Sequence, residues 1–190
     1  MKKILGILWK YKYFLFISLV IIFYVVYTET GRDNEDFQTE IADQGVGYKS
    51  IIPGVNSENE LIEVFDNEIS SEENDSRKVN EYESTSPVRH HQAIIENKKV
   101  SFIKEIISVN DALTSKDLKD EHGEPDFMLY DKTSPNSSYF LFVYPGKGLA
   151  YLGHEDGTLL EVWYFPPTNI TDFINNWASD YSFEKPEPIQ

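Results

Sequence analysis

The sequence predicts an α+β fold class, in which short helices pack on an antiparallel β-meander behind an N-terminal transmembrane helix. Three observations predict it. Short apolar runs rich in β-branched and aromatic residues alternate with turn signals, which is typical of antiparallel strands. Three segments carry apolar residues at helical spacing just after a capping residue. The chain also begins with a long uncharged apolar run, which is typical of a membrane span.

The apolar run covers residues 13–28, and it contains no charged residue. At about 1.5 Å per residue it spans roughly 24 Å, so flanking Trp9 and Tyr11 are expected to lie in the membrane interface. The four charged residues before Glu29 are all lysines, and mainly acidic residues follow. Because positively charged flanks remain inside the cell, we expect a single-pass signal anchor in the plasma membrane. Residues 1–12 would then be cytoplasmic and the rest extracytoplasmic.

A cleaved signal peptide is the alternative to an anchor. The basic start and the apolar run fit a signal peptide, but the segment that follows begins with Thr28, Glu29 and Thr30, and the first alanine is Ala42. A signal peptidase requires small residues at alternating positions before its cleavage site. The sequence therefore favours an uncleaved anchor.

The exported part of the chain is strongly acidic. After the four N-terminal lysines it carries 13 Lys and Arg against 32 Asp and Glu, a formal charge of −19. Such a surface repels phosphate backbones, so we expect no binding of nucleic acid. The chain has no cysteine, which excludes disulfides, thiolate metal sites and attachment of a lipid to an N-terminal cysteine.

The composition divides the exported part into three segments. Residues 29–47 are polar and acidic, which predicts a solvated tether. Residues 48–183 form the extracytoplasmic α+β domain, and residues 184–190 form a disordered tail. Within the domain, the polar run 68–81 predicts a long loop.

The first half of the domain begins with a short strand at 51–52 and a turn. Ser57 caps a helix over 58–65, and Glu60 completes a capping box. Leu61 and Phe65 lie on one face of this helix and are expected to pack on the core. Strands are predicted at 82–85, 92–95 and 100–109.

The second half follows the same order. Thr114 or Ser115 caps a helix over 115–121, which ends at Gly123. Strands separated by turn-rich segments are predicted at 127–130, 139–144, 148–153 and 159–165. A last helix is predicted over 171–178.

Two stretches carry a resemblance to a known family. The first runs from Ile52-Pro53-Gly54 through Ser57 and Glu60-Leu61 to Val64-Phe65, and the other runs from Leu113-Thr114-Ser115 through Leu118 to Gly123 and Pro125. The first stretch resembles the opening of small envelope domains of the BamE/SmpA type, and the other stretch is similar to a degraded copy of it. The resemblance implies two tandem helix-plus-strands repeats and a role in assembling envelope proteins. The lipid-bearing cysteine of that family is missing here.

No residue pattern specifies a reaction. The chain lacks the glycine-rich, G-x-S-x-G and H-E-x-x-H motifs of nucleotide-binding proteins, hydrolases and metalloproteases. The adjacent His90 and His91 would point to opposite faces of a strand, so a zinc site would need a further ligand such as His154. We therefore expect no enzyme activity, no cofactor and no metal site.

The aromatic strands are the strongest feature of the sequence. They contribute a candidate interaction surface of six residues: Tyr139, Phe140, Phe142, Tyr144, Trp163 and Phe165. Alternation places apolar side chains on both faces of the strand 139–144. Either the fold covers both faces, or a partner covers one of them.

The function expected from the sequence is that of a non-enzymatic interaction module. A single-pass anchor through residues 13–28 would display the domain outside the membrane. The partner would be another envelope protein, with roles in envelope assembly or scaffolding. The alternative is a membrane-tethered enzyme or small-ligand-binding domain, with a pocket beneath the aromatic strands that uses His122, His154 or Tyr144.

Overall fold

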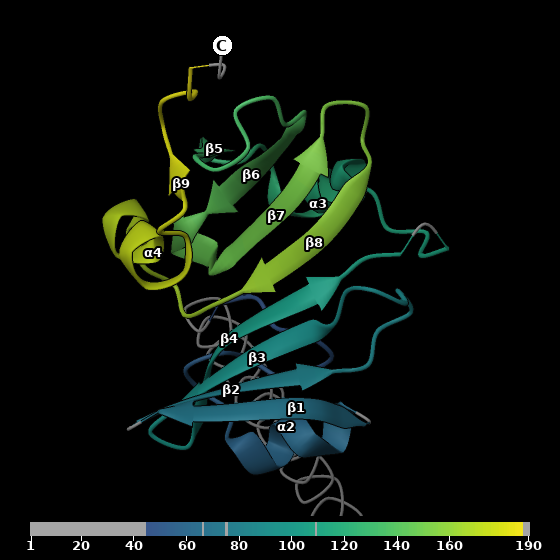
Figure 1. Ribbon diagram of the computed structural model, residues 1–190, viewed down its shortest axis with the longest axis vertical. Coiled ribbons are helices and arrows are strands. Elements are labelled where there is room, and N and C mark those ends of the chain that lie inside the picture. Colours follow the sequence, from purple (N-terminus) through teal and green to yellow (C-terminus); the bar gives the residue numbers. More distant parts are fainter. Residues whose placement is uncertain (1–44, 66, 75, 109, 188–190) are drawn as a thin grey trace, which may run out of the picture. The chain divides into compact units, whose positions relative to one another are not determined.

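The computed structural model describes residues 45–187 except 66, 75 and 109. In these residues nine strands form a single sheet in the order β1-β2-β3-β4-β8-β7-β6-β5-β9, and every pair of neighbours is antiparallel (Figure 1). The strands β4 and β8 lie side by side in the middle. They join the strands of the first half to those of the second.

Strands outnumber helices in the described part of the chain. The strands are β1 (Glu68–Asn74), β2 (Arg77–Tyr82), β3 (His91–Glu96), β4 (Lys99–Ile106), β5 (Phe127–Asp131), β6 (Tyr139–Tyr144), β7 (Leu149–His154), β8 (Leu159–Tyr164) and β9 (Tyr181–Ser182). The helices are α2 (Glu58–Val64), α3 (Ser115–His122) and α4 (Ile170–Trp177), with a 3-10 turn η1 (Pro145–Lys147).

The predicted fold class is wrong. The structure is mostly β, with nine strands in one continuous antiparallel sheet and, in the described residues, three helices of seven or eight residues each. The sequence predicted two tandem helix-plus-strands units, whereas the strands of both halves belong to one sheet. The physical reason is the pairing of β4 with β8, in which Ile103 faces Tyr164 and Ile106 faces Glu161. This pairing satisfies edge groups that two separate units would leave open.

The predicted loop at 68–81 is also wrong, because this stretch is the hairpin β1-β2. Every residue of β1 is exposed, so the strand has no apolar alternation from which it could be predicted. Polar contacts across the hairpin take the place of apolar packing. Ser70 Oγ donates to Glu81 Oε2 and Ser71 Oγ donates to Asn80 Oδ1, both at 2.9 Å.

The described residues contain no helix that is long and apolar enough to cross a membrane. The predicted anchor at 13–28 and the segment 1–12, predicted to be cytoplasmic, lie outside these residues. Most of the predicted tether 29–47 also lies outside them.

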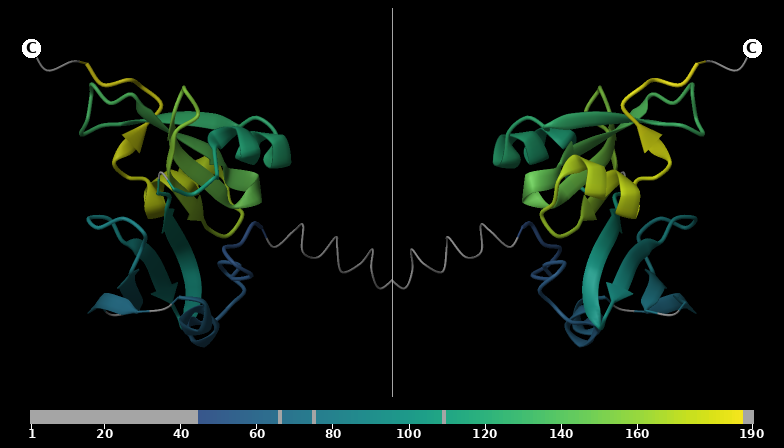
Figure 2. Two further views of the ribbon diagram at one scale, coloured as in Figure 1. Left: turned by 90° about the vertical axis from the view of Figure 1, so that its right-hand side faces the viewer. Right: turned by 90° about the vertical axis from the view of Figure 1, so that its left-hand side faces the viewer.

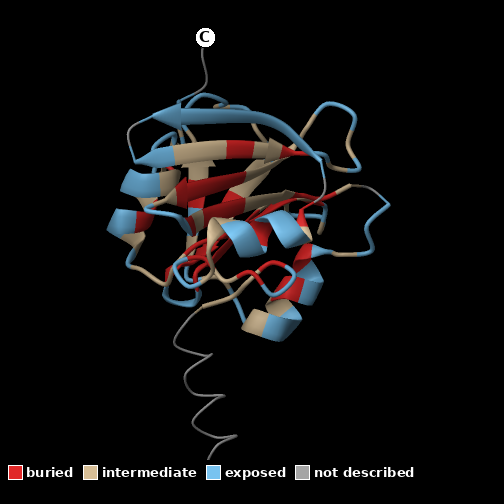
Figure 3. Ribbon diagram, turned by 90° about the horizontal axis from the view of Figure 1, so that it is seen from below, coloured by how far each residue is buried: buried red, intermediate tan, exposed pale blue. Residues whose placement is uncertain are grey.

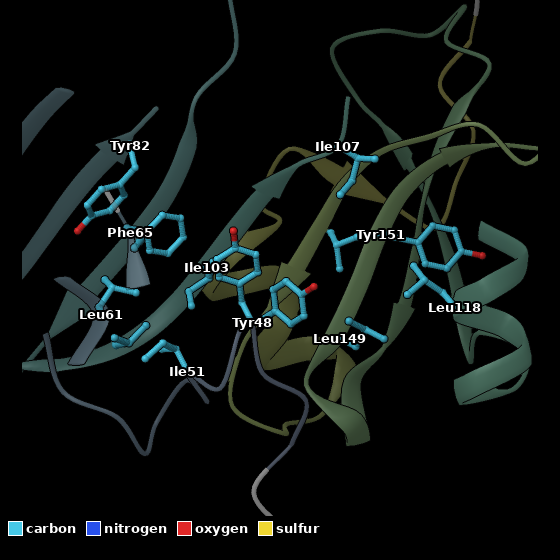
Figure 4. Packing of buried hydrophobic residues seen from close by; sticks show 14 of the residues in the cluster. Tyr48, Ile51, Leu61, Phe65, Tyr82, Ile103, Ile107, Leu118, Leu149 and Tyr151 are labelled. Atoms are coloured by element: carbon cyan, nitrogen blue, oxygen red, sulfur yellow. The ribbon is translucent and has the colours of Figure 1, made fainter. Parts of the chain in front are cut away.

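One face of the sheet, here called the α2/α3 face, carries both early helices. Leu61 of α2 and Leu118 of α3 join the same core cluster as Tyr82, Ile103 and Tyr151. Figure 4 shows Leu61 and Tyr82 at one end of this cluster, Leu118 and Tyr151 at the other end, and Tyr48 between them. The cluster also contains the buried aromatic residues Phe65, Tyr144 and Tyr164, and large aromatic side chains of this kind remove much apolar area from water.

The opposite face of the sheet carries α4 and is here called the α4 face (Figure 2). Phe173 of α4 is fully buried, and its ring lies 4.6 Å from that of Phe165 and 6.3 Å from that of Trp163. Trp177 stacks on Phe102 of β4 at 6.2 Å. The helix α4 therefore packs against strands from both halves of the sheet.

The segment before α2 lies across the α2/α3 face. The ring of Tyr48 stacks on that of Phe65 at 5.0 Å and lies 5.9 Å from that of Tyr164. Backbone hydrogen bonds tie this segment to the 3-10 turn and to β4, from Val46 N to Lys147 O and from Gly54 N to Val100 O. We call residues 45–54 the strap, because they connect parts of the sheet that are distant in the sequence.

Gly148 is required where the chain enters β7. Its φ of +68° lies in the left-handed region, which favours glycine. A Cβ atom built there would lie 2.0 Å from the carbonyl oxygen of Phe165. No other residue type fits this position without moving the backbone.

Candidate functional site

The structure divides the six aromatic residues of the predicted interaction surface between the two faces of the sheet. Phe140, Phe142 and Tyr144 lie on the α2/α3 face, and Tyr139, Trp163 and Phe165 lie on the α4 face. Tyr144, Trp163 and Phe165 are buried, with exposed fractions of 1%, 6% and 0%. The six residues therefore do not form one continuous surface.

A small aromatic group stays partly open on the α2/α3 face. The ring of Phe140 lies 5.6 Å from that of Tyr130 and 6.3 Å from that of Phe142. Met128 beside them is 38% exposed. Single apolar side chains of this kind are common on protein surfaces.

The tyrosines under α3 are protonated at neutral pH. Tyr144 donates a hydrogen bond from its hydroxyl to the carbonyl oxygen of Gly123 at 2.8 Å, and burial raises its pKa to about 12. Burial also raises the pKa of Tyr151, whose hydroxyl is buried beside Tyr144. His122 lies near Tyr144, with a ring distance of 6.3 Å. His154 instead packs on Tyr139, on the other face.

The histidines predicted as possible metal ligands do not come together. His91 Nδ1 accepts a hydrogen bond from the backbone N–H of Ile106 at 3.0 Å, and His154 Nδ1 accepts one from the N–H of Asp156 at 3.1 Å. Each of these bonds takes the Nδ1 atom of its ring. The described residues contain no group of three or more His, Asp or Glu side chains that could hold a metal ion.

A polar cluster lies where the strap crosses β4 and β8. The hydroxyl of Tyr164 donates to Glu105 Oε2 at 2.8 Å, and burial raises the pKa of Glu105. Burial lowers the pKa of His91, whose ring lies 6.2 Å from that of Tyr48. Tyr48 of the strap lies against the rings of both His91 and Tyr164, so this cluster lies where the strap packs on the sheet. Nothing in the sequence predicted it, since Glu105 lies in an otherwise ordinary strand.

We expect Glu105→Gln to stabilise the protein near neutral pH. Because the pKa of Glu105 is raised, the folded protein binds this proton more tightly than the unfolded chain does. The pKa of a glutamate is ordinarily 4.5, and that of Glu105 is higher in the folded protein. As the pH rises through this interval, ionisation of Glu105 therefore lowers the free energy of unfolding. Glutamine keeps an oxygen acceptor for Tyr164 and removes the charge.

Urea unfolding at several pH values checks this expectation. The midpoint of Glu105→Gln should exceed that of the natural protein at pH 7.5, and the difference should shrink to nothing by pH 4. Glu155→Gln, at an exposed turn position, is the matched control and should not change the midpoint. A Glu105→Gln variant that is less stable at pH 7.5 would contradict the prediction.

An ion pair between half-buried Arg89 and buried Glu161 joins the β2-β3 loop to the centre of the sheet. Glu161 of β8 is 8% exposed. Its Oε1 atom accepts from Nη2 of Arg89 and its Oε2 atom accepts from Nε1 of Trp163 at 2.6 Å. Arg89 and Glu161 are 72 residues apart in the sequence. The spacing of Glu161 and Trp163 places both side chains on one face of a strand. Nothing in the sequence indicates that Arg89 would pair with Glu161.

The strand β1 forms an open edge of the sheet. It pairs with β2 on one side and, in the described part of the chain, with no strand on the other. Figure 3 shows it exposed along its whole length. It carries Glu68, Glu72 and Glu73, and a bulge between Glu68 and Ser70 leaves Ile69 46% exposed.

A cavity of about 650 Å³ lies beside α4. It is formed mainly by the C-terminal residues 181–187, together with Lys132 and Ile174. Its polar side chains come largely from an exposed segment. The residues of the pocket expected beneath the aromatic strands, His122, His154 and Tyr144, do not line this cavity.

Comparison with known proteins adds no relative. The chain matches no protein-family model, no curated protein and no solved structure. The resemblance to BamE/SmpA-type domains therefore stays a prediction.

Proposed function

We propose that this protein is a membrane-anchored interaction module. Residues 13–28 hold it in the plasma membrane, and the sheet domain binds another envelope protein outside the cytoplasm. The observation that carries the proposal is the open edge at β1, because an unpaired strand presents backbone N–H and C=O groups that another chain can bind.

The partly buried polar side chains bond to one another, which supports a binding role over a catalytic one. Glu105 and Tyr164 bond to each other, and Glu161 bonds to Arg89 and Trp163. A catalytic site needs a nucleophile, an acid or a base with access to a substrate. These side chains are instead used to hold the fold together.

The experiment has two parts, both on intact cells or spheroplasts that make the full chain with a C-terminal tag. In the first part, protease is added from outside. Loss of the tag is the expected result, whereas a protected tag would show that the proposed orientation is wrong.

In the second part, the same membranes are treated with formaldehyde and the tagged protein is isolated under denaturing conditions. We expect a discrete crosslinked product that contains a second envelope protein. If the tag is accessible but no discrete product forms, the interaction role is wrong while the topology stands.

A further inference from the structure

We propose that β1 is a docking edge for an extended protein segment that carries two consecutive basic residues. This inference rests on the proposed function and names the chemistry of the partner. The segment would add to the sheet as a further strand beside β1. Backbone hydrogen bonds would hold it, and the glutamates of β1 would select its side chains.

The backbone of β1 is available for such pairing. In an antiparallel pair, alternate residues direct their N–H and C=O groups away from the partner strand. The register with β2 is regular from Ser70 to Asn74, so the outward groups of this stretch form a straight row. All of its side chains are exposed, and no helix or loop of the described chain is paired along this row.

The two central glutamates point to opposite faces of the sheet. Glu73 lies opposite Lys78, whose ammonium group bonds to Glu58 of α2 at 2.6 Å, so Glu73 lies on the α2/α3 face. Glu72 lies opposite Val79, on the α4 face. A strand added beside them would place consecutive residues next to Glu72 and Glu73, one on each face.

The charges near β1 are not balanced within the described chain. Residues 58–83 contain ten acidic and two basic residues. Both basic residues already form ion pairs, Arg77 with Glu96 at 3.8 Å and Lys78 with Glu58. Within the described residues, no ion pair forms with Glu68, Glu72 or Glu73. A basic segment is therefore the complementary partner.

A second copy of this chain is a poor occupant of the same edge. Pairing β1 with another β1 would bring glutamates of the two copies together, and like charges across a strand pair are destabilising. The glutamates thus oppose self-association through this edge, as charged residues on edge strands commonly do. The exposed Ile69 adds an apolar contact that favours a segment with apolar residues beside the basic pair.

The test uses the full-length protein in neutral detergent micelles and a fluorescent peptide of sequence VTVKKVT. We expect saturable binding, with new hydrogen-exchange protection confined to residues 68–74. Glu72→Lys combined with Glu73→Lys should weaken binding at least tenfold. The matched control, Glu155→Lys combined with Glu184→Lys, makes the same change in net charge at exposed positions and should weaken binding less than twofold.

A peptide with methyl groups on alternate backbone nitrogens separates strand addition from simple charge attraction. It keeps both lysines and loses the backbone donors, so we expect at least tenfold weaker binding to the natural protein. Equal binding of this peptide, equal loss in both charge variants, or protection outside β1 would each overturn the proposal. Dimerisation of the protein through β1 would also overturn it.

Failure here is distinguishable from failure of the proposed function. If the formaldehyde product forms equally well with the Glu72→Lys and Glu73→Lys variant, the domain binds its partner elsewhere. The interaction role would then stand without the docking edge.

Discussion

Phe173→Ala is expected to lower the free energy of unfolding by about 3–5 kcal/mol, the range for a buried phenylalanine. Phe173 is fully buried, and its ring lies within 4.6 Å of that of Phe165. It is the residue of α4 that the sheet covers completely. Its loss leaves a cavity between α4 and the sheet that the rigid rings of Trp163 and Trp177 cannot fill.

Urea unfolding, followed by tryptophan fluorescence, measures this effect. Asn175→Ala is the matched control, because Asn175 lies on the exposed side of the same helix. It should change the free energy of unfolding by less than about 0.5 kcal/mol. A Phe173→Ala variant with near-natural stability would show that α4 does not pack on the sheet as described.

Arg89→Met is expected to cost about 3 kcal/mol, because it leaves the carboxylate of Glu161 buried without its cation. The value is placed at the low end of the range for broken buried pairs, since the Arg89 side chain is 33% exposed. Glu161→Gln in the same chain should recover most of the loss, since the amide oxygen still accepts from Trp163 and no unpaired charge remains.

A double-mutant cycle over these two positions gives the coupling energy, which we expect to exceed about 1 kcal/mol. Lys116→Met combined with Asp120→Asn is the control cycle. That ion pair is exposed on α3 and should couple by less than about 0.5 kcal/mol. If the effects of the two substitutions on the free energy of unfolding simply add, Arg89 and Glu161 do not interact and the prediction is wrong.

The sequence predicts local structure well where apolar periodicity is strong. The helices α2, α3 and α4 and the strands β3 to β8 lie within a few residues of their predicted ranges. The predicted caps of the first two helices are confirmed, since Ser57 forms a capping box with Glu60 and Thr114 is the N-cap of α3. The cap expected for the last helix, Thr168 or Thr171, was wrong, because Asn169 is the N-cap of α4. These features depend on residues close together in the chain.

Features that depend on distant residues were missed. The strand β1 has no apolar pattern, because neither of its faces is buried. The pairing of β4 with β8 decides between one sheet and two units, and no local pattern encodes it. The fold class was therefore wrong although most of its elements were right.

The candidate interaction surface shows the same limit. The alternation of the strand 139–144 correctly separates Phe140 and Phe142 from Tyr139. It cannot show that Trp163 and Phe165 lie under α4, because that burial depends on a helix which follows them in the chain. The sequence shows that residues 68–81 are acidic. Only the structure shows that Glu68, Glu72 and Glu73 lie on a strand at the edge of the sheet.

The central pairing of β4 with β8 also bears on how the chain folds. The other strand pairs of the two halves are mostly hairpins between successive strands, but Ile103 must find Tyr164 across about sixty intervening residues. Closing so long a loop is slow, because the chain loses conformational entropy before the contact between the two strands provides any stabilisation. During synthesis from the N-terminus, β4 is an open apolar edge until β8 is made. We expect this interval to be when the chain is most prone to aggregate.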